Sequence, residues 1–131
     1  MTDSKSYNAL MLDHYRHPRN FGNLERPDIA HEESNTMCGD RIRIEASISQ
    51  GMLTDVRFKG RGCAISIAAA SMLTEMLKGR SIMDLKDLTD DDMLKALGIP
   101  VKRTRLNCAL LGLKVFRKAA FGSHAEDDLM K

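Results

Sequence analysis

Two alternating segments between residues 41 and 59, joined by a short turn, constrain the fold more than any other feature. The positions that share one face are Ile42, Ile44, Ala46, Ile48, Thr54, Val56 and Phe58. A period of two places successive side chains on opposite faces of a strand. Residues 49–52 supply the turn, so the sequence predicts an antiparallel hairpin. Its inward side chains Ile42, Ile44, Val56 and Phe58 are expected to pack against helices.

Helices are predicted before and after this hairpin in the sequence. The first is expected to be capped by Ser4 or Ser6 and to end before His17-Pro18, because the residue before a proline is driven out of the helical region. A second helix is predicted at residues 65–77, which are rich in Ala, Met and Leu and are followed by the stop signal Gly79.

The C-terminal half adds two more predicted helices. Thr89 and Asp92 resemble a capping box that starts a short helix through Leu97. The last helix is expected at about residues 105–121, with an apolar stripe of Leu106, Leu110, Leu113, Phe116 and Ala120. A further strand is predicted between residues 28 and 36. This order favours an α+β fold, with helices packed against one face of a small antiparallel sheet.

Length and charge exclude several classes of protein. The chain is expected to form one domain over residues 1–131, with about 1–5 and 123–131 as flexible ends. Its net charge is only +2, from 20 Lys and Arg against 18 Asp and Glu, which favours neither nucleic acid nor membrane as a partner. It has no apolar stretch long enough for a bilayer and no signal-peptide pattern, so a cytoplasmic location is predicted.

Each of the three cysteines stands at the end of a predicted element. Cys38 precedes the first strand of the hairpin, and Cys63 lies between the second strand and the long helix. Cys108 lies in the first turn of the last helix, off the predicted stripe. An odd number of cysteines in a chain without an export signal argues against disulfides and for metal binding or thiol chemistry.

These positions suit thiolates. A helix N-terminus stabilises a thiolate, and Arg61 and Arg105 can add positive charge beside Cys63 and Cys108. Asp40 follows the first cysteine by two residues, on the same side of an extended chain, and can supply a carboxylate as fourth ligand. Three thiolates and one oxygen make a tetrahedral site that suits zinc or the iron of a sulfide cluster.

Spacing alone leaves another interpretation open. The chain has no CxxC pair, and a free cysteine is often a small buried apolar residue. Among the histidines, His14 and His17 are expected to pack or cap, and His124 is expected to be solvated. His31 could reach the site from the loop before Cys38, although nothing in its spacing requires it.

Four segments resemble, in order, those of the IscU/SufU/NifU-N-terminal family of iron–sulfur scaffold proteins, over nearly the whole chain. They are Tyr7 with residues 13–22 (DHYRHPRNFG), Cys38-Gly39-Asp40, residues 58–66 (FKGRGCAIS) with Ala69, Ala70 and Ser71, and residues 105–111 (RLNCALL). The resemblance implies a SufE/NifU-like fold. It also implies a carrier, rather than an enzyme, that accepts sulfur from a cysteine desulfurase, receives iron and passes a 2Fe–2S cluster to acceptor proteins.

The resemblance also implies roles for particular residues. Cys38, Asp40, Cys63 and Cys108 would hold the cluster or its iron, and zinc could occupy the same ligands. Cys108, Cys63 or Cys38 would accept the persulfide sulfur. A carboxylate is a harder ligand than a thiolate, so Asp40 would hold a soft cluster less firmly and ease its release.

One position departs from the IscU pattern. IscU-type scaffolds carry His immediately before the third cysteine, where this chain has Asn107. The third motif is closer to the Arg-x-Lys-Cys of SufU, although the chain is too short between Cys63 and Cys108 for the SufU insertion. Residues 99–102 (IPVK) faintly resemble the Leu-Pro-Pro-Val-Lys of IscU, which docks an Hsp70-type chaperone. The alternatives are a zinc-dependent sulfurtransferase of the SufU type and a degenerate relative that only binds other proteins.

Overall fold

The computed structural model describes residues 8–36 and 39–122. Cys38, Ser4, Ser6 and His124 lie outside the described residues, and so do the predicted flexible ends at 1–5 and 123–131.

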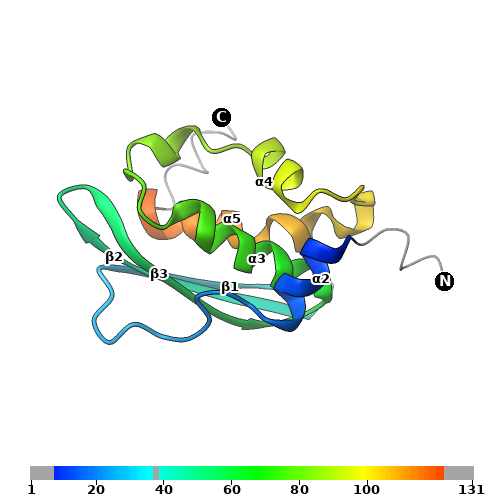
Figure 1. The fold of residues 1–131 in the computed structure, drawn as a ribbon. Helices are drawn as coiled ribbons and strands as arrows, with labels where there is room; N and C mark the ends of the chain where they lie inside the picture. Colours follow the sequence, from blue (N-terminus) through cyan, green and yellow to red (C-terminus); the bar gives the residue numbers. More distant parts are fainter. Residues whose placement is uncertain (1–7, 37–38, 123–131) are drawn as a thin grey trace.

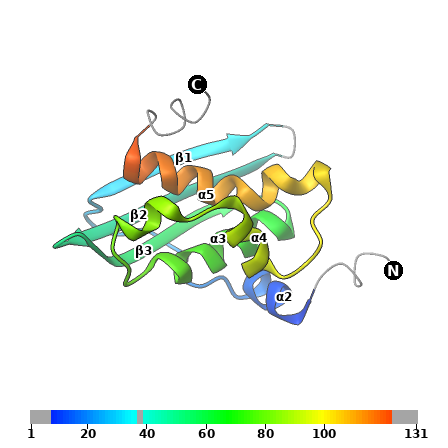
Figure 2. The same ribbon diagram turned by 90° about the horizontal axis from the view of Figure 1, so that it is seen from above.

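The described chain forms three layers (Figures 1 and 2). Its elements are α2 (Ala9–Arg16), β1 (Ile29–Asn35), β2 (Asp40–Ser49), β3 (Met52–Arg61), α3 (Ala64–Leu77), the 3₁₀ helix η1 (Asp84–Asp87), α4 (Asp90–Leu97), the 3₁₀ helix η2 (Arg103–Arg105) and α5 (Leu106–Phe121). The strands form one antiparallel sheet in the order β1-β2-β3. Helix α5 lies over β1 and β2, α3 lies over β3, and α4 covers both helices. The predicted α+β fold is confirmed.

The predicted hairpin supplies the sheet's buried face. Its inward side chains are all fully buried: Ile42, Ile44, Val56 and Phe58. Gln50 and Gly51 make the turn with φ of 52° and 76°. Strand β3 continues beyond the predicted segment to Arg61, because Gly60 has no side chain there. A Cβ on Gly60 would lie 2.2 Å from the backbone oxygen of Arg41.

The helix boundaries agree with the sequence at most ends. Helix α2 stops at Arg16, and Thr89 and Asp92 form the predicted capping box of α4. The cap of α2 is different, because Asn8 rather than a serine precedes the helix. Its side chain accepts a hydrogen bond from the Met11 backbone N–H at 2.7 Å. Asn8 also donates to the Gly98 carbonyl oxygen at 3.2 Å, which ties α2 to the end of α4.

The predicted stripe of α5 is partly wrong. Leu113 and Phe116 are buried as expected, but Leu106, Leu110 and Ala120 are only half-buried. The other buried residues of α5 are Cys108, Ala109, Leu111, Gly112 and Val115. The buried face is wide because α5 packs against both the sheet and α3. Cys108 is therefore inside the buried face and not beside it.

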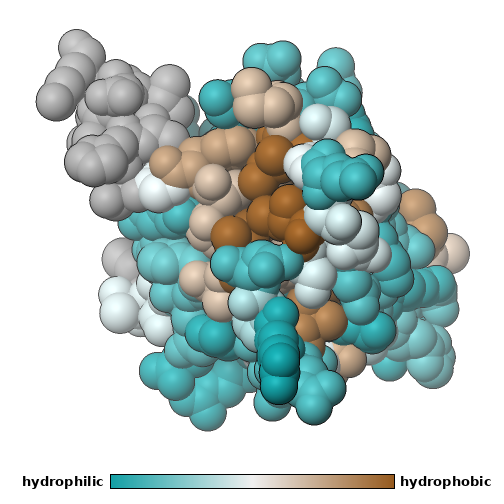
Figure 3. Space-filling view, turned by 90° about the vertical axis from the view of Figure 1, so that its left-hand side faces the viewer, coloured by the Kyte–Doolittle hydropathy of each residue, from teal (hydrophilic) through white to brown (hydrophobic). Residues whose placement is uncertain are grey.

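The two ends of the sheet differ in chemistry. Figure 3 shows apolar side chains gathered at the end that carries the β2–β3 turn, where Met52 and Met83 are exposed. Asp40 begins β2 and Arg61 ends β3, so the residues around Cys63 lie at the opposite end of the hairpin. Among the described residues, no helix is long and apolar enough to span a membrane.

Candidate metal centre

Three segments that are distant in sequence meet at the end of the sheet opposite the β2–β3 turn. Asp40 is the first residue of β2, Cys63 is the N-cap of α3, and Cys108 lies in the first turn of α5. One ligand atom from each, the two sulfurs and a carboxylate oxygen, lie within 4.8 Å of one another. The structure thus brings together three of the four predicted ligands, and the fourth, Cys38, lies outside the described residues.

The two oxygens of Asp40 have different surroundings. Asp40 is fully buried, and its Oδ1 accepts a hydrogen bond from the Cys63 backbone N–H at 3.0 Å. Its Oδ2 is buried and has no hydrogen-bond partner among the described residues. A buried acceptor without a partner costs free energy, and a cation beside it would remove that cost. Two thiols and a carboxylate oxygen fit zinc or iron by the chemistry of the donor set.

The backbone at Gly62 keeps Asp40 and Cys63 close together. Gly62 has φ of +157°, and a Cβ there would lie 2.3 Å from Oδ1 of Asp40 and 2.6 Å from Oγ of Ser66. Any larger residue would have to displace the carboxylate or the hydroxyl. Glycine is therefore a steric requirement of the site, and not only of the turn into α3.

Ser66 lies next to Cys63, and the sequence analysis did not assign it a role at the site. Its hydroxyl donates to the Cys63 carbonyl oxygen at 3.0 Å and accepts from the Cys63 thiol at 3.7 Å. The spacing indicates such a role, because a serine three residues after an N-cap lies in the first turn of the helix and its hydroxyl can bond to the N-cap residue. Ser66 helps to hold the orientation of the Cys63 side chain.

Arg105 supplies the positive charge that the sequence predicted. The negative charge of Cys63, a hydrogen bond to Cys63 and the charge of Cys108 raise the pKa of the Arg105 guanidinium. Arg105 is exposed, whereas Cys63 is half-buried and Cys108 is buried. The exposed guanidinium therefore interacts with both cysteine side chains of the site.

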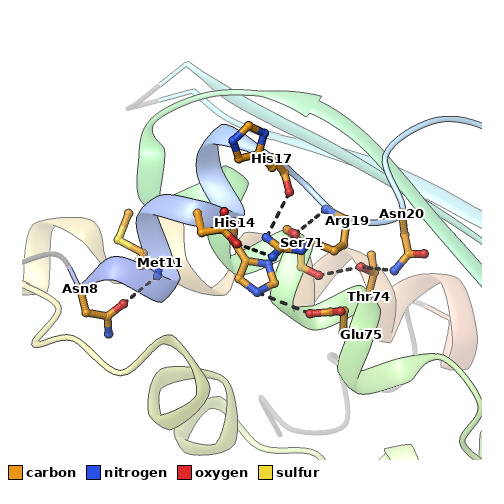
Figure 4. A network of polar contacts seen from close by, with 10 residues as sticks. Asn8, Met11, His14, His17, Arg19, Asn20, Ser71, Thr74 and Glu75 are labelled. Atoms are coloured by element: carbon orange, nitrogen blue, oxygen red, sulfur yellow. Dashed lines mark hydrogen bonds and ion pairs between the residues drawn. The ribbon is translucent and has the colours of Figure 1, made fainter.

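His14 has the structural role that was predicted. It is buried, its Nδ1 lies 2.7 Å from Oγ of Ser71, and its Nε2 lies 3.5 Å from Oε1 of Glu75 (Figure 4). Ser71 Oγ also accepts from the Arg19 backbone N–H at 2.8 Å. The Ser71 hydroxyl keeps its proton and can donate it to Nδ1 of a neutral imidazole. His17 is the C-cap of α2, as expected of a capping residue.

Two other positions considered for the site do not join it. His31 lies in β1 opposite Ile44, and its Nε2 is 2.9 Å from Oε2 of Glu33. It belongs to a strand, not to a loop, and is absent from the group of ligand atoms that includes Asp40. Asn107 is exposed beside Cys108.

Comparisons with known proteins show which family this chain resembles. Residues 6–126 match the family described as NifU-like N terminal domain. The chain is 38% identical over 131 residues to the iron–sulfur cluster assembly scaffold protein IscU of Aquifex aeolicus, covering 98% of this chain and 79% of that protein. It is 34% identical over 131 residues to the zinc-dependent sulfurtransferase SufU of Bacillus subtilis, covering 86% and 87%.

Solved structures share the fold. The SufU crystal structure from Fervidobacterium islandicum aligns with a TM-score of 0.77 at 21% identity, over 88% of this chain and 97% of that chain. A NifU-like N-terminal domain from Brucella abortus aligns with a TM-score of 0.75 at 17% identity, over 98% and 99%. The family match, the sequence relatives and the shared fold agree, and the chain belongs to the NifU-like N-terminal domain family, which includes IscU and SufU relatives.

Proposed function

We propose that this protein is a scaffold for iron–sulfur cluster assembly, which receives sulfur and iron and hands a 2Fe–2S cluster to acceptor proteins. The observation that carries the proposal is the meeting of two thiols with the carboxylate of buried Asp40, whose Oδ2 has no hydrogen-bond partner in the described chain. The scaffold relatives from Aquifex aeolicus and Archaeoglobus fulgidus support it. A carrier role, a cytoplasmic location and an Hsp70-type chaperone partner stay predictions.

The cargo would be held by Cys38, Asp40, Cys63 and Cys108. Thiolates are soft ligands that suit iron and sulfide, and the carboxylate is the hard and weaker member of the set. Asp40 also holds the Cys63 backbone through Oδ1, so one side chain shapes the site and offers it a ligand atom.

Sulfur would arrive as a persulfide on a cysteine desulfurase. A scaffold thiolate attacks the terminal sulfur, a new S–S bond forms on the scaffold, the old S–S bond breaks, and the desulfurase thiolate leaves with the electron pair. No net oxidation occurs. Of the two described cysteines, Cys63 is half-buried and Cys108 is buried. A partner therefore reaches Cys63 without rearrangement of the scaffold, whereas transfer to Cys108 requires the site to open.

A zinc-dependent sulfurtransferase is the second candidate. The SufU relative of Bacillus subtilis favours it, and so does Asn107, which places an amide where IscU-type scaffolds carry an imidazole. In that case the same ligands would hold zinc, and one thiolate would accept sulfur from the desulfurase.

Anaerobic reconstitution distinguishes these functions. The protein is incubated with a cysteine desulfurase, cysteine and ferrous iron, and its zinc, iron, labile sulfide and visible absorption are measured. A scaffold gains iron and sulfide together, with the absorption of a 2Fe–2S cluster. A sulfurtransferase keeps zinc and gains persulfide without iron. Binding of neither metal would contradict both and leave a protein that only binds other proteins. The double variant Cys63→Ser/Cys108→Ser is the control.

A further inference from the structure

The face of the sheet that points away from the helices becomes more positive toward the candidate metal centre. The strand register places outward side chains in rows across β1, β2 and β3. The row of Ala30, Glu45 and Arg57 has no net charge. The next row, Glu32, Arg43 and Lys59, has a net charge of +1, and the row nearest the centre, Ser34, Arg41 and Arg61, has +2.

Four of these residues form a basic quartet, Arg41, Arg43, Lys59 and Arg61. Arg41 is directly opposite Arg61, and Arg43 is directly opposite Lys59. Like charges that face each other across two strands destabilise a sheet, so folding does not explain this arrangement.

Carboxylates neutralise only half of the quartet. Arg43 Nε lies 2.8 Å from Glu45 and Arg41 Nε lies 3.6 Å from Glu32. Lys59 and Arg61 are exposed and make no ion pair within the described part of the chain. The quartet borders a shallow hollow of about 350 Å³, into which carboxylates of another molecule can fit.

The quartet lies at the same end of the hairpin as the thiols. Arg41 follows Asp40 directly, and Arg61 is two residues before Cys63. A protein whose persulfide comes within bonding distance of Cys63 approaches the end of the hairpin at which the quartet lies. Arginine side chains bind carboxylates in pairs of parallel hydrogen bonds, which gives such a contact orientation as well as attraction.

The size of the patch favours protein carboxylates over nucleic acid. Two rows are only about 7 Å apart along the strands. Buried Glu45 and partly exposed Glu32 lie next to the cations. Nucleic-acid sites use longer basic tracks, and single-stranded sites add exposed aromatic rings. None of the outward residues in these three rows is aromatic.

We propose that the basic quartet is the docking surface for the protein that delivers sulfur, and that this donor carries carboxylates around its persulfide-bearing cysteine. The inference rests on the proposed function, since it requires that a desulfurase loads the site. The quartet steers the encounter and orients the donor, while the thiols receive its sulfur.

The test compares two variants that each lose two positive charges. Lys59→Gln/Arg61→Gln removes the two unpaired cations of the quartet, and Lys86→Gln/Lys95→Gln removes two exposed cations from η1 and α4. Association with the cysteine desulfurase of the source organism is measured by biolayer interferometry from about 50 to about 500 mM NaCl, a range over which screening shortens to a few ångströms. Zinc affinity, measured in parallel, reports whether the site and fold are intact.

The quartet variant should associate about tenfold more slowly than wild type at low salt, with a flatter salt dependence, while the helical variant behaves as wild type. Equal association rates for both variants would overturn the docking surface and leave the proposed function standing. No desulfurase binding by wild type would overturn both. If the quartet variant instead loses binding of a single-stranded RNA oligonucleotide and keeps desulfurase binding, the surface belongs to nucleic acid and the inference is wrong.

Discussion

At the scale of single residues, Asp40 combines two tasks that can be separated by substitution. Oδ1 accepts the hydrogen bond from the Cys63 backbone N–H, Oδ2 is buried without a hydrogen-bond partner in the described chain, and one carboxylate oxygen lies within 4.8 Å of both sulfurs. Asp40→Ala removes both, whereas Asp40→Asn keeps an acceptor for the N–H and loses the negative charge.

Asp40→Ala should weaken zinc binding by at least about tenfold, because a ligand is lost and less negative charge faces the dication. Asp40→Asn should also weaken zinc binding. Asn107→His should recover part of the affinity in the Asp40→Ala background. Competition titrations with a zinc chelator measure all four proteins. Wild-type affinity in Asp40→Asn would mean that Asp40 acts only by holding Cys63, and wild-type affinity in Asp40→Ala would exclude it as a ligand.

Gly62 is a second residue to test, because both its backbone conformation and the neighbouring Asp40 and Ser66 disfavour any side chain there. Gly62→Ala should lower the free energy of unfolding by about 2 kcal/mol, from backbone strain and displacement of Asp40, and should also weaken zinc binding. Gly51→Ala is the matched control, since Gly51 has φ of +76° but open space around it. It should cost about 1 kcal/mol and leave zinc affinity unchanged. Urea denaturation and chelator titration measure the two effects, and equal zinc affinities in the two variants would contradict the steric argument.

At the scale of elements, the joint between α2 and α3 depends on a neutral histidine. Burial first, and then the positive charge of Arg19, lower the pKa of His14 below its ordinary value of 6.5, against the opposing charges of Glu75 and Asp13. Between the two pKa values the unfolded chain binds a proton that the folded chain does not. Stability therefore rises with pH through this window, is fully present above pH 6.5, and is lost as pH falls below it.

His14→Gln should make the free energy of unfolding less dependent on pH between about 7.5 and about 5.5, because the buried imidazole is the group whose protonation opposes folding there. Urea denaturation in the presence of a chelator, at a series of pH values, measures this. His17→Gln, which changes an exposed histidine one helical turn away, should keep the wild-type slope. A His14→Gln slope as steep as that of wild type would show that other groups carry the effect.

At the scale of the whole molecule, the candidate metal centre joins the sheet to both long helices. Its described ligand atoms come from the start of β2, the N-cap of α3 and the first turn of α5. A metal bound there connects segments up to 68 residues apart, from Asp40 to Cys108. Binding to the folded chain is therefore linked to global stability.

Zinc should raise the unfolding temperature of the whole domain. At free zinc of about 100 times Kd, the gain is about 2.7 kcal/mol if the unfolded chain does not bind. Calorimetry with zinc, and with zinc plus excess chelator, measures the shift. Cys63→Ser/Cys108→Ser should show none, and an equal shift in this variant would place the stabilising zinc elsewhere.

Local patterns in the sequence were sufficient to predict the helices, the strands and the class of fold. The period of two placed Ile42, Ile44, Val56 and Phe58 on the buried face, and Thr89 with Asp92 started α4. These features depend on neighbours within a few residues, so the sequence contains their cause. The motifs around Cys63 and Cys108 also pointed to the correct ends of helices, because turn and helix-start residues mark such ends.

The tertiary structure decided what depends on neighbours distant in the chain. The buried face of α5 is wider than its stripe because both the sheet and α3 pack on it, which also buries Cys108. The two oxygens of Asp40 differ because Cys63, 23 residues away, donates a hydrogen bond to Oδ1, whereas Oδ2 is buried without a partner in the described chain. The facing pairs of the basic quartet follow from strand register, which sets residues of β2 opposite those of β3. Sequence periodicity fixes which side chains share a face, but only pairing and packing determine what stands opposite them.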